Sequence, residues 1–186
     1  AENPRNPHRP PRRVKYGVES SDEMAELWLR VLPREPDGAA RLEAASVPKV
    51  LASALSYNRY LLERDPGNGR ARAELGKALV MLGRTGEAEP HLDAAIRQRP
   101  DDDEPRYFRG IAHRMQRQLD QAQACFEDAL RVNPANAKAH GNLGLVRMER
   151  GDLDGAVRAF EAALRLNPAD EIARRSLEEI AAARRK

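Results

Sequence analysis

The pattern of small and apolar residues repeats between residues 69 and 170 at a constant interval of 34 residues. Glycine recurs at one position of the pattern, alanine at two others, and leucine or phenylalanine at a fourth. These residues are Gly76, Gly110 and Gly144; Ala88, Ala122 and Ala156; Ala95, Ala129 and Ala163; and Leu92, Phe126 and Phe160. A fixed period of this length is typical of stacked helical hairpins. The pattern predicts an all-α fold with helices at 70–82, 86–98, 104–116, 120–132, 137–149 and 154–166.

Proline and glycine mark the expected ends of these helices. Four prolines, each 34 residues from the next, close the second helices, because a residue before proline avoids the helical conformation. They are Pro66, Pro100, Pro134 and Pro168. Gly83 and Gly151 follow the first helices of their units, where a left-handed residue commonly ends a helix. A glycine inside a helix costs about 1 kcal/mol relative to alanine, so we expect the repeated glycines to allow close approach of two helices.

The period also divides the chain into units. Residues 69–170 hold three full units, 69–102, 103–136 and 137–170. The charged segment 171–186 is expected to be a capping helix, because the open end of a stack must face water. Residues 35–68 are interpreted as a linker and a degenerate unit. Its second helix is predicted at Val47–Asp65, after a short helical stretch around Ala39–Ala45.

Residues 1–34 have a different character. Ala1–Arg13 contains four prolines and four arginines, which disfavour both helix and inner strand. Arg13–Tyr16 is a candidate strand, so this segment is expected to be partly extended. Met24–Leu32 alternates as a strand would, yet its apolar residues also follow helical spacing, and both interpretations stay open. The chain begins at Ala1, and we expect it to be the C-terminal piece of a longer protein.

The repeated region resembles the tetratricopeptide repeat, whose pattern has an early Leu-Gly pair, later alanines, an aromatic residue and a terminal proline. Leu75-Gly76 and Leu143-Gly144 match the first pair directly, whereas Arg109-Gly110 departs at its first residue. The Trp and Tyr positions of the family hold polar or aliphatic residues here. These are Arg72 and Leu79, Arg106 and His113, and His140 and Arg147. The resemblance implies a solenoid with a concave face made by the first helices.

Members of this family usually bind peptides along that face. The residues that the resemblance places there are Arg70, Lys77, Glu104, Tyr107, Arg114, Lys138 and Asn142. Lys138 and Asn142 match two members of a clamp by which some relatives hold a C-terminal carboxylate. The corresponding slots of the earlier units hold Ala73, Lys77 and Phe108, so the clamp is incomplete and chaperone-tail binding is not predicted.

A second resemblance covers about 33 residues at the start of the chain. Asn3-Pro4-Arg5-Asn6-Pro7, Arg13-Val14-Lys15-Tyr16-Gly17 and Ser21-Asp22-Glu23-Met24 resemble the final strands of the copper type II, ascorbate-dependent monooxygenases. The methionine of that motif is a copper ligand in the family, together with a His-x-His pair from an earlier strand. The resemblance assigns this role to Met24. This chain lacks the His-x-His pair, so the rest of such a site would lie upstream, and the chain alone is expected to hold no cofactor.

Charge and motifs exclude several function classes. The net charge is +3, but residues 69–170 carry sixteen basic and sixteen acidic residues, and the excess lies in the first 18 residues and the last 16. No basic stripe with stacking aromatics is present, so nucleic-acid binding is not predicted. No apolar run approaches the length that spans a bilayer. No nucleophile elbow, metalloprotease helix or paired-cysteine metal motif occurs, and we predict no enzyme activity for this chain.

A few chemically distinctive residues have simpler interpretations. Cys125, the only cysteine, is predicted to be a buried small residue. The histidines at 91, 113 and 140 occupy different repeat positions and are not expected to form a ligand row. Asp101–Glu104 precedes a helix and is expected to cap it and complement its dipole. Met81 and Met115 share one repeat position, and packing between repeats is preferred to exposure on the binding face.

Three hypotheses about function follow. The leading one is a non-catalytic protein-interaction scaffold that binds a partner peptide or domain and forms the C-terminal part of a copper-monooxygenase-like protein. The second is a structural or assembly region of a copper-dependent oxidoreductase, with Met24 as one ligand. The third is a free-standing soluble adaptor. A location outside the cytoplasm is favoured under the copper resemblance and a cytoplasmic one otherwise.

Overall fold

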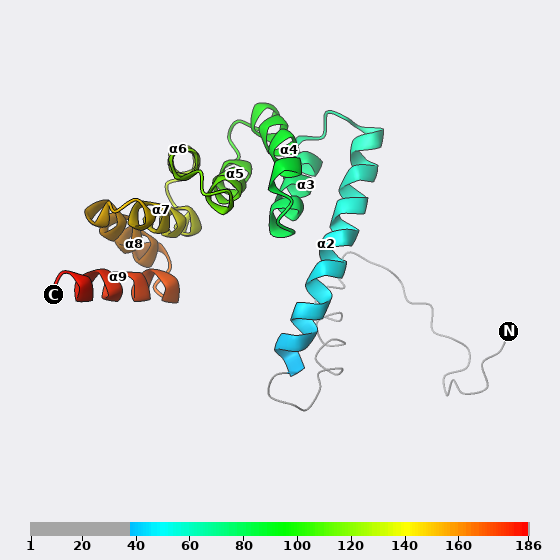
Figure 1. The fold of residues 1–186 in the computed structure, drawn as a ribbon. Helices are drawn as coiled ribbons and strands as arrows, with labels where there is room; N and C mark the ends of the chain where they lie inside the picture. Colours follow the sequence, from blue (N-terminus) through cyan, green and yellow to red (C-terminus); the bar gives the residue numbers. More distant parts are fainter. Residues whose placement is uncertain (1–37, 186) are drawn as a thin grey trace. The chain divides into compact units, whose positions relative to one another are not determined.

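The computed structural model describes residues 38–185, with side chains described from residue 49 onward. Within these residues all regular structure is α-helical (Figure 1). The helices are α2 (Gly38–Arg64), α3 (Gly69–Met81), α4 (Thr85–Gln98), α5 (Glu104–Met115), α6 (Leu119–Val132), α7 (Ala137–Glu149), α8 (Leu153–Leu166) and α9 (Glu171–Ala183). The six predicted repeat helices are confirmed, each to within one residue at either end. Residues 1–34, with Met24 and the open alternatives at 24–32, lie outside the described part.

The helices of residues 47–185 stack in sequence order (Figure 1). α3 packs on α4, α5 on α6 and α7 on α8, and each second helix also packs on the first helix of the next unit. The first helices additionally contact one another, α3 with α5, α5 with α7 and α7 with α9, whereas the described second helices do not. The fold is therefore a tetratricopeptide-type solenoid in which the first helices converge on one face.

The repeated glycines allow each hairpin to close, as predicted. A Cβ added at Gly76 would lie 2.6 Å from the side chain of Leu92, and one at Gly110 would lie 2.6 Å from the ring of Phe126. A Cβ added at Gly144 would lie at the same distance from the ring of Phe160. The three facing side chains are fully buried. The glycines therefore admit large apolar residues that fill the core between the two helices of each unit.

Each first helix ends in the same left-handed turn. Gly83 has a φ of 75° and Gly151 a φ of 83°, which confirms both predicted helix ends. The intervening unit places Arg117 at this position with a φ of 62°. In all three turns the next residue donates its N–H to a carbonyl five residues earlier, and the N···O distance is 2.9 Å each time. This is the 6→1 bond that terminates helices through a left-handed residue.

The region before the first full unit differs from the prediction. A short helical stretch and a separate helix were expected there, but α2 is one continuous helix of 27 residues. Leu51 and Leu55 of α2 are buried in one cluster with Leu75 and Leu79 of α3. α2 thus supplies the second-helix surface on which the first full unit packs.

The other end of the stack is covered by α9, as expected for a capping helix. Ala173, Ser176 and Ile180 are buried against the preceding unit. Charged residues occupy most of the opposite surface, which faces water. None of the helices described here is long and apolar enough to cross a membrane.

Candidate partner-binding face

The first helices α3, α5 and α7 contact one another and carry side chains that are at least partly exposed, and we call this set of side chains the first-helix face. It comprises Arg70, Lys77 and Met81 of α3; Glu104, Tyr107, Phe108, Ile111, Arg114 and Met115 of α5; and Lys138, Asn142 and Glu149 of α7. Residues spaced three, four or seven apart lie on one side of a helix, which places these side chains together. Contacts between neighbouring units link the three rows.

The first link joins α3 to α5. Lys77 Nζ donates a hydrogen bond to Glu104 Oε1 at 2.8 Å, and the same ammonium lies 5.5 Å from the centre of the Phe108 ring. Glu74 lies 3.7 Å from Lys77 on the same helix. The hydrogen bond to Glu104 raises the pKa of Lys77, so the amine remains protonated throughout the physiological range. Two residues predicted for the site are thus brought together, but they pair with each other.

The second link joins α5 to α7. Asn142 Nδ2 donates to the hydroxyl of Tyr107 at 3.3 Å. Burial raises the pKa of Tyr107, so the phenol stays neutral. Arg114 and Arg117 both pair with Glu149, at 3.5 and 3.2 Å. Among the predicted residues, Tyr107 and Asn142 therefore meet each other, while Arg114 meets an acidic residue that the sequence had not indicated.

Two predicted residues keep their charge available. Arg70 and Lys138 are exposed at the N-terminal ends of α3 and α7, and neither has an ion-pair partner among the described residues. Only the backbone carbonyl of Lys138 takes part in a hydrogen bond, which it accepts from Asn142 Nδ2 at 3.0 Å. The two cations thus remain able to meet an external acidic group.

The methionines correct one expectation. Packing between repeats was preferred for Met81 and Met115, but 55% and 51% of their surfaces are exposed. Met148, displaced by one position in the next unit, is partly buried in the core around Phe160. Phe108 and Ile111 are partly buried beside the core, between the two exposed methionines along the chain. The first-helix face therefore carries four apolar side chains, two flexible thioethers, an aromatic ring and a branched aliphatic group, which we call the apolar strip.

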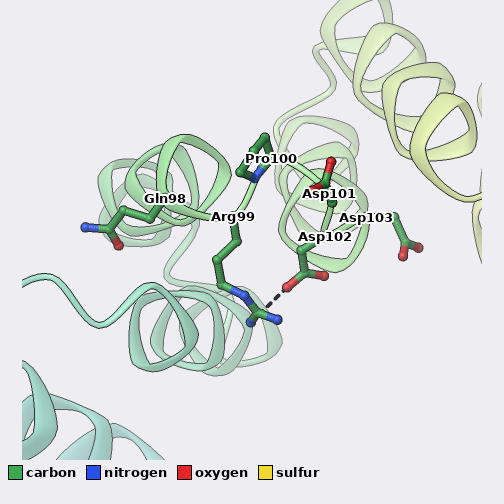
Figure 2. A pocket seen from close by; sticks show the side chains of 6 residues that line it. All are labelled: Gln98, Arg99, Pro100, Asp101, Asp102 and Asp103. Carbon is green, nitrogen blue, oxygen red and sulfur yellow. Dashed lines mark ion pairs between the residues drawn. The ribbon is translucent and has the colours of Figure 1, made fainter.

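The acidic turn before α5 lines a separate depression with Gln98, Arg99 and Pro100 (Figure 2). Arg99 pairs with Asp102 at 2.9 Å, and Asp102 also accepts the backbone N–H of Glu104 at 3.1 Å. The predicted capping role is therefore confirmed for Asp102. It is wrong for Asp103, whose carboxylate accepts hydrogen bonds from Asn133 and Asn136 in the turn that ends the same unit, at 3.3 and 2.6 Å. These carboxylates therefore stabilise the turns that connect neighbouring helices.

The cysteine and the histidines are placed as follows. Cys125 is buried as predicted, burial raises the pKa of its thiol, and its Sγ accepts a hydrogen bond from Arg109 Nε at 3.3 Å. His113 and His140 bond to Gln118 and to the carbonyl of Pro134. In the described part of the chain, no three His, Cys, Asp or Glu side chains lie close enough together to bind a metal ion. Met24, the predicted copper ligand, lies outside that part.

Comparison with known families and structures places the chain. Two models described as tetratricopeptide repeat match residues 51–112 and 107–171, which together make up well over half of the sequence. The chain therefore carries tetratricopeptide repeats over residues 51–171. No match is found among curated protein sequences.

Several solved structures share the fold. A crystal structure of MamA has a TM-score of 0.66 at 22% identity, covering 82% of this chain and 86% of that one. YrrB, described as a TPR protein with an unusual peptide-binding site, has a TM-score of 0.62 at 23% identity, with coverages of 76% and 72%. The first TPR of Spaghetti (RPAP3), bound to the HSP90 peptide SRMEEVD, has a TM-score of 0.61 at 21% identity, with coverages of 63% and 94%. At these identities the similarity concerns the fold alone.

Proposed function

We propose that this chain is a non-catalytic protein-interaction scaffold that binds a partner peptide along the first-helix face. The observation that carries the proposal is the exposure of Met81 and Met115 at the same position of consecutive units. Flexible, polarizable thioethers suit an adaptable binding surface. The ion pairs and hydrogen bonds that surround them are already satisfied within the protein, so the apolar strip and the two free cations remain for a partner.

The proposed partner is a segment with bulky apolar side chains and at least one acidic group. Apolar side chains would cover the strip between Met81 and Met115, and the acidic group would pair with Lys138 or Arg70. Related folds support peptide binding, since the names of two of them refer to a bound peptide and to a peptide-binding site. Because the carboxylate clamp is incomplete, we do not assign the HSP90 peptide itself to this chain.

Selection from a displayed peptide library, followed by calorimetry on the best binder, tests this function. Lys138→Glu should weaken binding about tenfold or more, because it replaces an attraction by a repulsion at the face. Met115→Glu should weaken it further by placing a charge in the apolar strip. Arg165→Glu is the matched control, because Arg165 is also an exposed basic residue but lies on the second helix α8. Equal affinities for all four proteins would exclude the first-helix face.

We further propose, from the motif at residues 3–24, that the scaffold is joined to a copper-monooxygenase-like domain in a longer protein. In such a protein Met24 would be one thioether ligand, and its partners would be histidines from upstream sequence, since a thioether binds copper well only with other ligands. The full-length Met24→Ala variant is expected to lose one copper equivalent by elemental analysis, and Met81→Ala is the matched control. Full copper retention in Met24→Ala would remove this assignment and leave the scaffold function unchanged.

A further inference from the structure

An open pocket lies where α2 meets the first full hairpin, and none of its lining residues belongs to the first-helix face. The lining residues are Arg59, Leu62 and Glu63 of α2, Arg72 and Leu75 of α3, and His91 of α4. Leu62 and Leu75 make part of the wall apolar. Three basic side chains, one from each helix, make up most of the remainder.

The three basic groups have spare hydrogen-bonding capacity. Arg72 donates Nε and Nη2 to the carbonyl oxygen of Pro66, at 3.2 and 2.8 Å, which leaves its Nη1 group free of that bond. Arg59 has no ion-pair partner among the described residues. His91 Nδ1 is buried and has no hydrogen-bond partner there. A buried polar atom without a partner is unusual in a folded protein and calls for an explanation.

The residues at equivalent positions of the later repeats show how this junction differs from the others. The position of Arg59 on α2 corresponds to Asp93 on α4 and Glu127 on α6, each 34 residues further along. At the second junction, Asp93 Oδ1 pairs with Arg109 Nη1 at 2.7 Å. At the third, Glu127 Oε1 pairs with Arg147 Nη2 at 3.0 Å. Both junctions thus contain a carboxylate on the second helix that neutralises an arginine of the next unit.

The first junction reverses this arrangement. Arg59 stands where the other junctions have a carboxylate, and the residue corresponding to buried Cys125 is His91. Arg59 and His91 therefore add two basic groups that the other junctions lack, beside Arg72, whose position is basic in every unit. Glu63 at the pocket lining and Glu87 on α4 are the acidic groups nearby, and neither forms an ion pair with Arg59 or Arg72 in the described structure.

We propose that this pocket binds the carboxylate side chain of an acidic residue from a partner. Arg59 and Arg72 supply the opposite charge, and His91 donates a hydrogen bond from its ring. Charge-assisted bonds of this kind are stronger than neutral ones. The methylene groups of a glutamate pack on Leu62 and Leu75, so glutamate is favoured over aspartate. This site is independent of the first-helix face and of the function proposed for it.

The proposal links binding to pH through His91. Burial, together with the charges of Arg72 and Arg59, lowers the pKa of His91, whereas Glu87 acts in the opposite direction. A bound carboxylate favours the imidazolium form, so by linkage its binding raises the pKa of His91, and the affinity increases as the pH falls. Glu63 is the other charged group at the pocket, and its negative charge opposes an incoming carboxylate.

NMR titration of the His91 ring in the whole chain tests the proposal. The probe is N-acetylglutamate amide, which carries only a side-chain carboxylate; N-acetylglutamine amide is its uncharged match, and N-acetylleucine carries a C-terminal carboxylate instead. We expect N-acetylglutamate amide to move the titration midpoint of His91 to higher pH, and N-acetylglutamine amide to leave it unchanged. His91→Gln identifies the resonance by removing it. A larger shift with N-acetylleucine would overturn the assignment to an acidic side chain.

Variants separate a built site from general charge attraction. Arg59→Gln should weaken binding about tenfold, because it removes a charge-assisted bond. Glu63→Gln should strengthen binding by removing the opposing charge. Arg97→Gln is the matched control, since Arg97 is an exposed arginine of α4 outside both the pocket and the first-helix face. Equal weakening by Arg59→Gln and Arg97→Gln, or an equal shift with sodium chloride at matched ionic strength, would overturn the proposal.

Discussion

Among the described residues other than glycine, Arg117 alone has a positive φ. The left-handed conformation costs an L-residue with a Cβ about 1–2 kcal/mol, whereas glycine adopts it readily. The other two units have glycine at this position, so the middle unit keeps the same turn under strain. Arg117 pairs with Glu149, but it is mostly exposed, and such a pair contributes little to stability.

We therefore expect Arg117→Gly to raise the free energy of unfolding by about 1 kcal/mol, because relief of the turn outweighs the loss of an exposed ion pair. Urea denaturation followed by circular dichroism measures the change. Arg117→Ala is the control, since alanine loses the same ion pair but keeps the strain. If both variants have the same stability, the turn is not strained.

For the glycines inside the first helices we predict the opposite, that substitution lowers the free energy of unfolding. Gly110→Ala should lower the free energy of unfolding by about 1–2 kcal/mol, because the new Cβ would lie 2.6 Å from the rigid, buried ring of Phe126. The improved helix propensity of alanine recovers only part of the loss. Gly86→Ala is the matched control, as no atom lies within 4 Å of its Cβ position. Equal urea midpoints for the two variants would contradict the close approach.

At the scale of the helices, the 34-residue period was sufficient to predict where each repeat helix begins and ends. It could not predict α2 as one helix, because Pro36 and Gly38 suggested an interruption and Pro48 lies within the helix. The repeat position where the family has Trp holds Arg or His in this chain, and the role of these residues appears only in the structure. Each residue there donates to, or bonds with, a backbone carbonyl in the turn before its helix. The pairs are Arg72 with Pro66, Arg106 with Asp102, His140 with Pro134 and Arg174 with Pro168.

The candidate site was predicted less completely than the helices. The resemblance to the repeat family placed Lys77, Glu104, Tyr107 and Asn142 on one face, but it gave no means to see that they pair with one another across units. Those pairings depend on the distance and rotation between neighbouring first helices, which the period does not specify. For the same reason, the exposure of Met81 and Met115 could not be separated from packing between repeats.

The junction of α2, α3 and α4 gives a prediction for pH dependence. Since burial lowers the pKa of His91 in the folded state below its ordinary value of 6.5, the folded protein binds fewer protons there than the unfolded chain. Its contribution to stability is complete above about pH 6.5 and is lost as the pH falls through that value towards the lowered pKa. We expect urea midpoints between pH 7 and pH 5 to fall more for the wild type than for His91→Gln. Parallel curves would show that protonation of His91 does not strain this junction.

At the scale of the whole described stack, each unit contacts only its neighbours, so stability is the sum of unit and interface contributions. Interior helices are held from two sides, whereas α9 is held from one. Loss of α9 would uncover Ala156, Phe160 and Ala163 of α8, which form one apolar cluster with Ala173 and Ile180 of α9. The cap therefore limits how readily the stack opens from its C-terminal end.

Replacement of each of two isoleucines on α9 by glutamate tests how far the stack depends on this cap. Ile180 is 3% exposed and packs in the last core cluster, whereas Ile172 is 62% exposed on the same helix. Ile180→Glu buries a charge without a partner, so α9 should detach; Ile172→Glu adds a charge in water and should leave stability unchanged. In hydrogen exchange, Ile180→Glu should lose protection strongly in α9 and α8, less in α7, and least in α5 and α6. Uniform loss of protection along the chain would instead mean that the stack unfolds as one cooperative unit.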